Sequence, residues 1–185
     1  MLSNISIKKY LDSRDIIIEP WSEEMMGAAR ISIHFGEKIL VPKGDAVVDV
    51  VRGITPDYEE SQLTTQDPFR LDPGAFILGE TLERIGLSEK IGMILDGRST
   101  LARLGLTVVQ TAMIVDTGQR PKKMTLEVKN NGPHPILLYP KMKFCHAAFF
   151  LLNPPATIRY DTDGKYLSDD SQHPIFKKEI KSDKS

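Results

Sequence analysis

The chain has 185 residues, of which 41% are hydrophobic and 26% are charged, and its formal net charge is −1. These values are typical of one soluble globular domain and exclude a global attraction to nucleic acid or to an anionic membrane. The single cysteine, Cys145, excludes an intramolecular disulfide and a tetrathiolate zinc site, and favours a reducing cytoplasm. We expect neither export nor a membrane anchor, because we find no apolar run of sufficient length.

The N-terminal residues predict a short helix and then a strand. Ser6 is a capping-type residue, and Ile7 and Leu11 follow at helical spacing. Residues 16–18 are three consecutive isoleucines, which favour a β-strand, and Pro20 ends that strand.

Short apolar runs rich in β-branched residues then recur, mostly bounded by Gly, Pro, Asn or Asp, and this rhythm predicts a mainly β sandwich or barrel. The polar, acidic segment 55–68 is interpreted as an exposed loop and the Leu-Asp-Pro-Gly sequence at 71–74 as a turn. We expect residues 1–173 to form a single domain and 174–185 to be a charged, flexible tail. The expected strands are 30–35, 38–42, 46–51, 75–83, 91–95, 106–113, 123–130, 135–140 and 143–152.

The sequence GRSTLARLGL at 97–106 contains two arginines in an otherwise apolar run. As a short helix it puts Ser99 and Arg103 on one face, with Leu101 and Leu104 packing inward. Arg98, Ser99 and Thr100 then crowd the helix N-terminus, where free amides and guanidinium groups suit a phosphate. An ordinary N-cap with surface arginines explains the same spacing equally well.

The sequence KMTLEVKN at 123–130 alternates apolar and polar residues, so Glu127 lies on the outward face of a strand. A carboxylate on a rigid strand can act as a general base if it faces a cleft. A solvated glutamate beside Lys129 is the more common situation, and periodicity does not distinguish the two.

Other chemistry-bearing residues are less informative by themselves. Asp116 follows a β run and precedes Gly118, which predicts a turn with an Asx-type acceptor, although Asp116 can also bind a sugar hydroxyl. Cys145 and His146 are neighbours on a strand and point to opposite faces, so they do not form a nucleophilic pair. No phosphate-binding loop or dinucleotide-binding motif is present.

The segment from about Gly92 to Leu152 resembles the dCTP deaminase branch of the dCTP deaminase/dUTPase superfamily. The resemblance is carried by GRSTLAR, then Thr-Ala, an Asp-x-Gly turn and Leu-Glu, in that order and at the expected distances. It implies a distorted jelly-roll-like β-barrel of the dUTPase-like β-clip type, with short helices, in a homotrimer whose active sites lie between subunits. It also implies a dCTP/dUTP nucleotide as the partner, with Mg²⁺ on the triphosphate and no zinc.

The resemblance implies a role for each matching residue, and all of these roles are expectations. Glu127 matches the catalytic glutamate, which takes a proton from the water that attacks C4 of cytosine and delivers it to the departing ammonia. Arg103 matches an active-site arginine, and Asp116 contacts the sugar. The triphosphate and catalytic segment is Arg98, Ser99 and Thr100; the base-recognition segment is Thr111 and Ala112; the lid is Lys165 and Tyr166.

This chain departs from the family pattern at three places. The turn after Asp116 reads DTGQRPKK, without the usual aromatic residue and second glycine and with one apparent insertion. Asp169 stands where the lid has glutamine, and the sequence AARISIHFG replaces an N-terminal Ser-Val-Asp-Leu segment. Three hypotheses follow: a dCTP deaminase, a hydrolase that forms dUTP and ammonia; a dUTP diphosphatase or bifunctional dCTP deaminase/dUTPase; and a catalytically degenerate nucleotide-binding relative.

Overall fold

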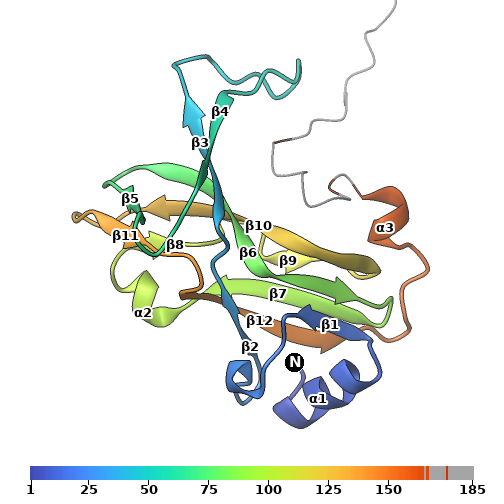
Figure 1. Ribbon diagram of the computed structural model, residues 1–185. Coiled ribbons are helices and arrows are strands. Elements are labelled where there is room, and N and C mark those ends of the chain that lie inside the picture. The colour runs from blue at the N-terminus through green and yellow to red at the C-terminus, as the bar shows by residue number, and fades with distance from the viewer. Residues whose placement is uncertain (165, 167–173, 175–185) are drawn as a thin grey trace, which may run out of the picture.

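Two antiparallel sheets form the body of the protein in the computed structural model, which describes residues 1–164, 166 and 174. One sheet has the strand order β4-β3-β6-β10-β8, with β1 also paired to β6, and the other has the order β2-β12-β7-β9 (Figure 1). Strands β5 and β11 form a separate pair. The prediction of a mainly β fold with short helices is confirmed.

The elements have the following bounds. The helices are α1 (Asn4–Asp12), α2 (Ser99–Ala102) and α3 (Tyr160–Asp163), with a 3-10 turn η1 (Glu23–Met25). The strands are β1 (Ile16–Glu19), β2 (Ile31–His34), β3 (Lys38–Lys43), β4 (Asp57–Gln62), β5 (Phe69–Leu71), β6 (Phe76–Leu87), β7 (Ile91–Gly97), β8 (Leu106–Thr107), β9 (Ile114–Val115), β10 (Gln119–Asn130), β11 (Ile136–Leu138) and β12 (Lys143–Leu151).

The core lies between the two sheets. A single cluster of buried side chains includes Ile77 of β6 and Leu126 of β10 from one sheet, and Met93 of β7 and Phe149 of β12 from the other. Alternating apolar residues on these strands point to the shared interior, as the period of a strand requires. The long antiparallel pair β6–β10 supplies residues of the candidate site described below.

Helix α1 begins earlier than predicted. Ser3, not Ser6, is the N-cap residue, and its side-chain oxygen accepts the Ser6 N–H at 3.5 Å. Ser6 therefore lies in the first helical turn. The backbone of Ser3 is extended, and in this conformation the serine side-chain oxygen can accept a hydrogen bond from the N–H three residues later.

The polar segment 55–68 is not simply a loop, since it contains β4. Strand β4 pairs with β3 along its whole length, and its glutamates lie beside lysines of β3, with Lys38 Nζ 2.9 Å from Glu60 Oε2 and Lys43 in contact with Glu59. Its polarity reflects its place at the sheet edge, where both faces meet water, together with these cross-strand charge pairs.

Three predicted strands differ most from the structure, and one of them, 135–140, is shortened to Ile136–Leu138. Segment 46–51 is an exposed turn region at the tip of the β3–β4 pair, because the Asp49 carboxylate accepts the amide protons of Val51 and Arg52 and bends the chain there (Figure 1). Segment 106–113 keeps strand pairing only at β8, because Val108 and Val109 leave the ladder and are buried in the core.

The expected division into a domain of residues 1–173 and a tail at 174–185 remains a prediction, since 175–185 lie outside the described residues. In the part of the chain that the structure describes, no helix combines the length and apolar character needed to cross a membrane.

Candidate active site

A cavity of about 570 Å³ opens beside β10. Strand β10 supplies one wall, the segment around β9 supplies a second, and α3 with Tyr166 supplies a third. Tyr58 also lines the cavity, from β4 at the edge of the sheet that contains β10. Its volume lies within the range of about 300–1,000 Å³ that is usual for small-molecule sites, and apolar residues such as Phe76 and Leu95 form much of its lining. The charged lining residues are Asp116, Lys122, Lys123 and Glu127.

Glu127 is held in this cavity by the alternation of β10. Leu126 and Val128 are buried, and Glu127 lies on the opposite face of the strand from Leu126, as predicted. Glu127 lines the cavity, a point that the periodicity left open. The Glu127 side chain is half-buried, and this burial raises the pKa of its carboxyl, against the opposing effect of its own amide and that of Gln110. A carboxyl with a raised pKa is suited to accept and return a proton.

Asp116 also lines the cavity, from the turn that joins β9 to β10. Gly118 in this turn has φ +68°, a left-handed conformation that favours glycine. Gln119 is buried, and its side-chain Nε2 donates to the Asp116 carbonyl oxygen at 2.8 Å. The predicted turn is therefore present, but the predicted Asx-type acceptor is wrong, because the hydrogen bond of this turn goes to the Asp116 backbone carbonyl and not to its carboxylate. Of the expected base-recognition residues, Ala112 lines the cavity, whereas Thr111 is exposed beside it and does not.

Helix α2, with its arginines, lies outside the cavity. Ser99, Thr100 and Arg103 are exposed, and the half-buried Arg98 is the N-cap residue, whose Nη1 donates to Ser32 Oγ at 3.4 Å. None of the four is among the cavity-lining residues of the described chain. Within one chain, therefore, the fold does not bring the expected anion-binding residues together with Glu127.

The apolar face of α2 is smaller than predicted. Leu101 is buried, but Leu104 is 57% exposed, so the prediction that both pack inward is wrong. The helix ends at Ala102, and the chain turns at Gly105, which has φ +87°. Leu104 therefore lies beyond the helix and not on the same helical face as Leu101.

The two expected lid residues have different outcomes. Lys165 lies outside the described residues. Tyr166 lines the cavity, its N–H donates to the Tyr160 hydroxyl at 3.1 Å, and its carbonyl accepts from Lys122. The Lys122 ammonium also lies 4.6 Å from the centre of the Tyr160 ring. This ammonium thus links β10 to the C-terminal wall of the cavity.

Sequence reasoning missed Lys122 and Lys123, which both line the cavity although they are consecutive. Strand β10 is irregular around this pair, because its register against β6 shifts before Lys122 and again after Lys123. Lys123 Nζ lies 2.5 Å from Oε1 of the buried Glu80. The one-residue insertion in the sequence was the available signal, since an inserted residue in a paired strand produces a bulge.

The Cys145 and His146 side chains provide no nucleophile. Cys145 is fully buried, and burial raises the pKa of its thiol. His146 has its pKa lowered to about 4, first by burial and then by the positive charges of Arg30 and Arg98, and its buried Nδ1 has no hydrogen-bond partner. Among the described residues, no group of three or more His, Cys, Asp and Glu side chains is arranged to hold a metal ion.

Comparison with known proteins identifies the family of the chain. A family model described as dCTP deaminase-like matches residues 1–152. A protein of Dictyoglomus turgidum named dCTP deaminase, dUMP-forming, is 35% identical over 165 residues, covering 86% of this chain and 84% of that protein. A protein of Nanoarchaeum equitans with the same name is 32% identical over 185 residues, covering 91% and 93%. The Rhodospirillum rubrum dCTP deaminase is 34% identical over 169 residues, covering 86% of each.

A solved structure extends the similarity to the fold. The 2′-deoxycytidine 5′-triphosphate deaminase from Agrobacterium tumefaciens matches with a TM-score of 0.63 at 14% identity, over 82% of this chain and 48% of that one. This chain thus spans about half the length of that protein. The family model and the relatives, which match most of the sequence and include the strand that carries Glu127, show that the chain belongs to the dCTP deaminase-like family.

Proposed function

We propose that the protein deaminates dCTP, converting dCTP and water to dUTP and ammonia. The observation that carries this proposal is Glu127, a half-buried carboxylate with a raised pKa on a rigid strand, facing a cavity of nucleotide-binding size. In the proposed reaction, Glu127 removes a proton from water, the resulting hydroxide attacks C4 of cytosine, and the C4–N4 bond breaks as Glu127 returns the proton to the leaving ammonia.

The remaining cavity residues are proposed to bind the nucleoside. Asp116 accepts a hydrogen bond from the deoxyribose hydroxyl, and the backbone of Thr111 and Ala112 recognises the base and positions the attacking water. Tyr166 is proposed to close over the bound nucleotide. Support comes from the family membership and from the positions of Asp116, Ala112 and Tyr166 in the cavity lining.

We infer that Arg98, Ser99, Thr100 and Arg103 bind the triphosphate and the reacting groups from a neighbouring subunit of a homotrimer. Two facts support this inference. These residues lie on or beside an exposed helix, outside the cavity that contains Glu127. Guanidinium groups, hydroxyls and helix amides are effective phosphate ligands only when they face the phosphate. A second copy of the chain would supply that juxtaposition, with the active site at the subunit boundary.

The substrate is expected to enter as the magnesium complex of the nucleotide. Magnesium ions are generally held by substrate phosphates, water and one or two carboxylates rather than by a cage of protein ligands. We also infer a cytoplasmic location, supported by the nucleotide substrate and by the single buried cysteine.

A second candidate is a bifunctional reaction in which dUTP is hydrolysed further to dUMP and pyrophosphate. The names of the Dictyoglomus and Nanoarchaeum relatives, dCTP deaminase, dUMP-forming, favour this outcome. The altered turn that follows Asp116 is the part of this chain in which a change of chemistry would be expected first. Both candidates share the deamination step and differ in the fate of dUTP.

One incubation with dCTP and magnesium tests these proposals, with all products identified, and a parallel incubation uses dUTP. Ammonia with dUTP supports the deaminase, and ammonia with dUMP and pyrophosphate supports the bifunctional enzyme. Pyrophosphate from dUTP without any ammonia from dCTP would support a dUTP diphosphatase and overturn deamination. Tight binding of dCTP with no product would support a catalytically degenerate relative.

A further inference from the structure

The wall of the cavity that carries Asp116 is held from two sides. On one side, the 88–90 turn between β6 and β7 accepts hydrogen bonds at the Ser88 carbonyl from Thr117 Oγ1 at 2.6 Å and from the Gly118 N–H at 3.3 Å. On the other side, the start of α3 lies against the 116–119 turn, which carries Asp116. The Tyr160 N–H donates to the Thr117 carbonyl at 3.1 Å, and the Asp161 N–H donates to the Gly118 carbonyl at 3.0 Å. The position of Asp116 therefore depends on how these two segments are fixed.

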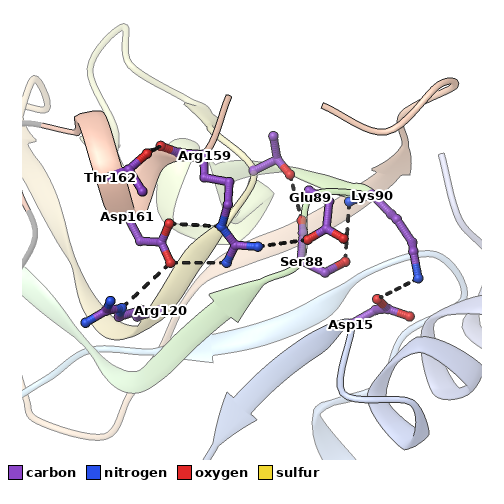
Figure 2. Close-up of polar contacts among 9 residues, drawn as sticks. Asp15, Ser88, Glu89, Lys90, Arg120, Arg159, Asp161 and Thr162 are labelled. Carbon is purple, nitrogen blue, oxygen red and sulfur yellow. Dashed lines mark hydrogen bonds and ion pairs between the residues drawn. The ribbon is translucent and has the colours of Figure 1, made fainter. Parts of the chain in front are cut away.

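Arg159 joins these two segments with one guanidinium group. Figure 2 shows it between Asp161 and Glu89: Nε and Nη2 donate to the two carboxylate oxygens of Asp161 at 3.0 and 3.1 Å, and Nη1 donates to Glu89 Oε2 at 3.0 Å. Arg120 approaches Asp161 as well, at 3.7 Å. The two parallel hydrogen bonds to Asp161 fix the plane of the Arg159 guanidinium group, and the third hydrogen bond links this group to the 88–90 turn.

The backbones of Gly118 and Arg159 are also in direct contact. A side chain at position 118 would place its Cβ 2.9 Å from the Arg159 Cβ and 3.0 Å from its Cα, closer than such atoms approach. The absence of a side chain at Gly118 is therefore required for the start of α3 to dock on this turn. Tyr160, the next residue, lines the cavity beside Lys122 of β10, and Asp116 and Gln119 of the turn line it as well.

We propose that Arg159 is a positioning residue for the nucleoside end of the cavity, and this inference rests on the proposed deamination of a cytosine nucleotide. Arg159 does not line the cavity. It acts by tying the start of α3 to the 88–90 turn through Glu89. The 88–90 turn binds Thr117 and Gly118 through the Ser88 carbonyl, so that Tyr160 and Asp116 face the nucleoside at a fixed separation. Because Arg159 is 45% exposed, its ion pairs contribute little to global stability, and their main effect is on the local geometry of this wall.

The test compares Arg159→Ala with Arg159→Lys, Glu89→Ala and Lys90→Ala in the full chain. Lys90→Ala is the matched control, because it removes a neighbouring exposed ion pair, with Asp15 at 3.4 Å, that does not touch the 116–119 turn (Figure 2). Steady-state kinetics with dCTP are combined with two binding probes that need no turnover. Deoxycytidine reports on the nucleoside end of the site, and inorganic tripolyphosphate reports on the phosphate end.

Arg159→Ala should raise the KM for dCTP and the dissociation constant of deoxycytidine by about tenfold, and should change kcat by less than about threefold. Tripolyphosphate binding should not change. Arg159→Lys should recover part of the loss, since one ammonium can hold one carboxylate but not span both. Glu89→Ala should have a smaller effect in the same direction, and Lys90→Ala none.

Unchanged deoxycytidine binding in Arg159→Ala overturns the inference, as does an equal loss for deoxycytidine and tripolyphosphate. If Arg159→Ala does not fold, the same criteria apply to Arg159→Lys and Glu89→Ala. The proposed function fails separately, if the wild-type protein forms no ammonia from dCTP, and the deoxycytidine measurement then still reports on Arg159 alone.

Discussion

Strand β10 around Glu127 and helix α2 around Arg103 carry the two halves of the expected chemistry, and their surroundings differ. Glu127 is half-buried in a cavity whose walls come from the same chain, and its pKa is raised by that burial. Arg103 is exposed at the C-cap of a helix of four residues, outside the cavity. Burial within one chain is sufficient to raise the pKa of a proton-transfer group such as Glu127. A phosphate-binding group such as Arg103 can act from an exposed surface, so the two groups of one active site can belong to different subunits.

The largest expected effect is on the enclosed half of this comparison. Glu127→Gln should lower kcat for ammonia release by at least the 10²–10⁴-fold typical of a lost general base, measured with saturating dCTP. It should also raise the thermal unfolding midpoint at neutral pH, because the ionised carboxylate is penalised by burial and the amide is not. Glu59→Gln on β4 is the control, an exposed strand glutamate beside Lys43. Turnover equal to wild type in Glu127→Gln contradicts the assignment.

The exposed half is tested by Arg103→Ala, which should lower kcat/KM by about 10–100-fold through loss of charge-assisted hydrogen bonds. Arg52→Ala, another exposed arginine, should have no effect. Coexpression of Arg103→Ala with Glu127→Gln then tests whether the halves meet between subunits. Random trimers should regain about a quarter of wild-type activity, because a site with both native residues forms wherever the two variants are suitably adjacent. No gain over the separate variants means that each site lies within one chain.

A smaller effect is expected from pH. Glu127 must be ionised to act as a base, and its pKa is raised above the ordinary value of 4.5, so the acid limb of kcat/KM should have its midpoint above pH 4.5. The same shift has a stability consequence of defined sign: protonation of Glu127 favours the folded state below pH 4.5, and this contribution is lost as pH rises through the folded pKa. An acid limb at or below pH 4.5, absent from the Glu127→Gln profile, contradicts the role of burial.

The smallest effect is expected on the α2 side, at His146. Its pKa of about 4 is lowered first by burial, then by Arg30 and then by Arg98, so Arg98→Ala should raise it slightly and leave it below 6.5. Proton NMR of the imidazole resonances across pH 3–8 measures this change. A His146 pKa in Arg98→Ala that equals the wild-type value would mean that the guanidinium charge does not reach this ring.

The sequence predicted the parts of the fold that follow from local periodicity. The alternation in KMTLEVKN placed Glu127 on the face of β10 opposite to Leu126, and the structure has it there. Periodicity failed where pairing decides the conformation. Segment 57–62 is polar yet forms β4, because the lysines of β3 lie beside its glutamates. Segment 46–51 is apolar yet forms a turn, because Asp49 captures the amides of Val51 and Arg52.

By itself the sequence determined the mainly β class, the family, and the identity of the residues expected to carry the chemistry, because these depend on residue types and on their spacing along the chain. Only the tertiary structure decided which of them share a cavity. It grouped Asp116, Ala112, Glu127 and Tyr166, added two lysines from the irregular part of β10, and left α2 outside. The physical reason is that burial, electrostatic environment and strand register depend on residues that are distant in the sequence. The local spacing of residue types does not show which of these distant residues will be neighbours.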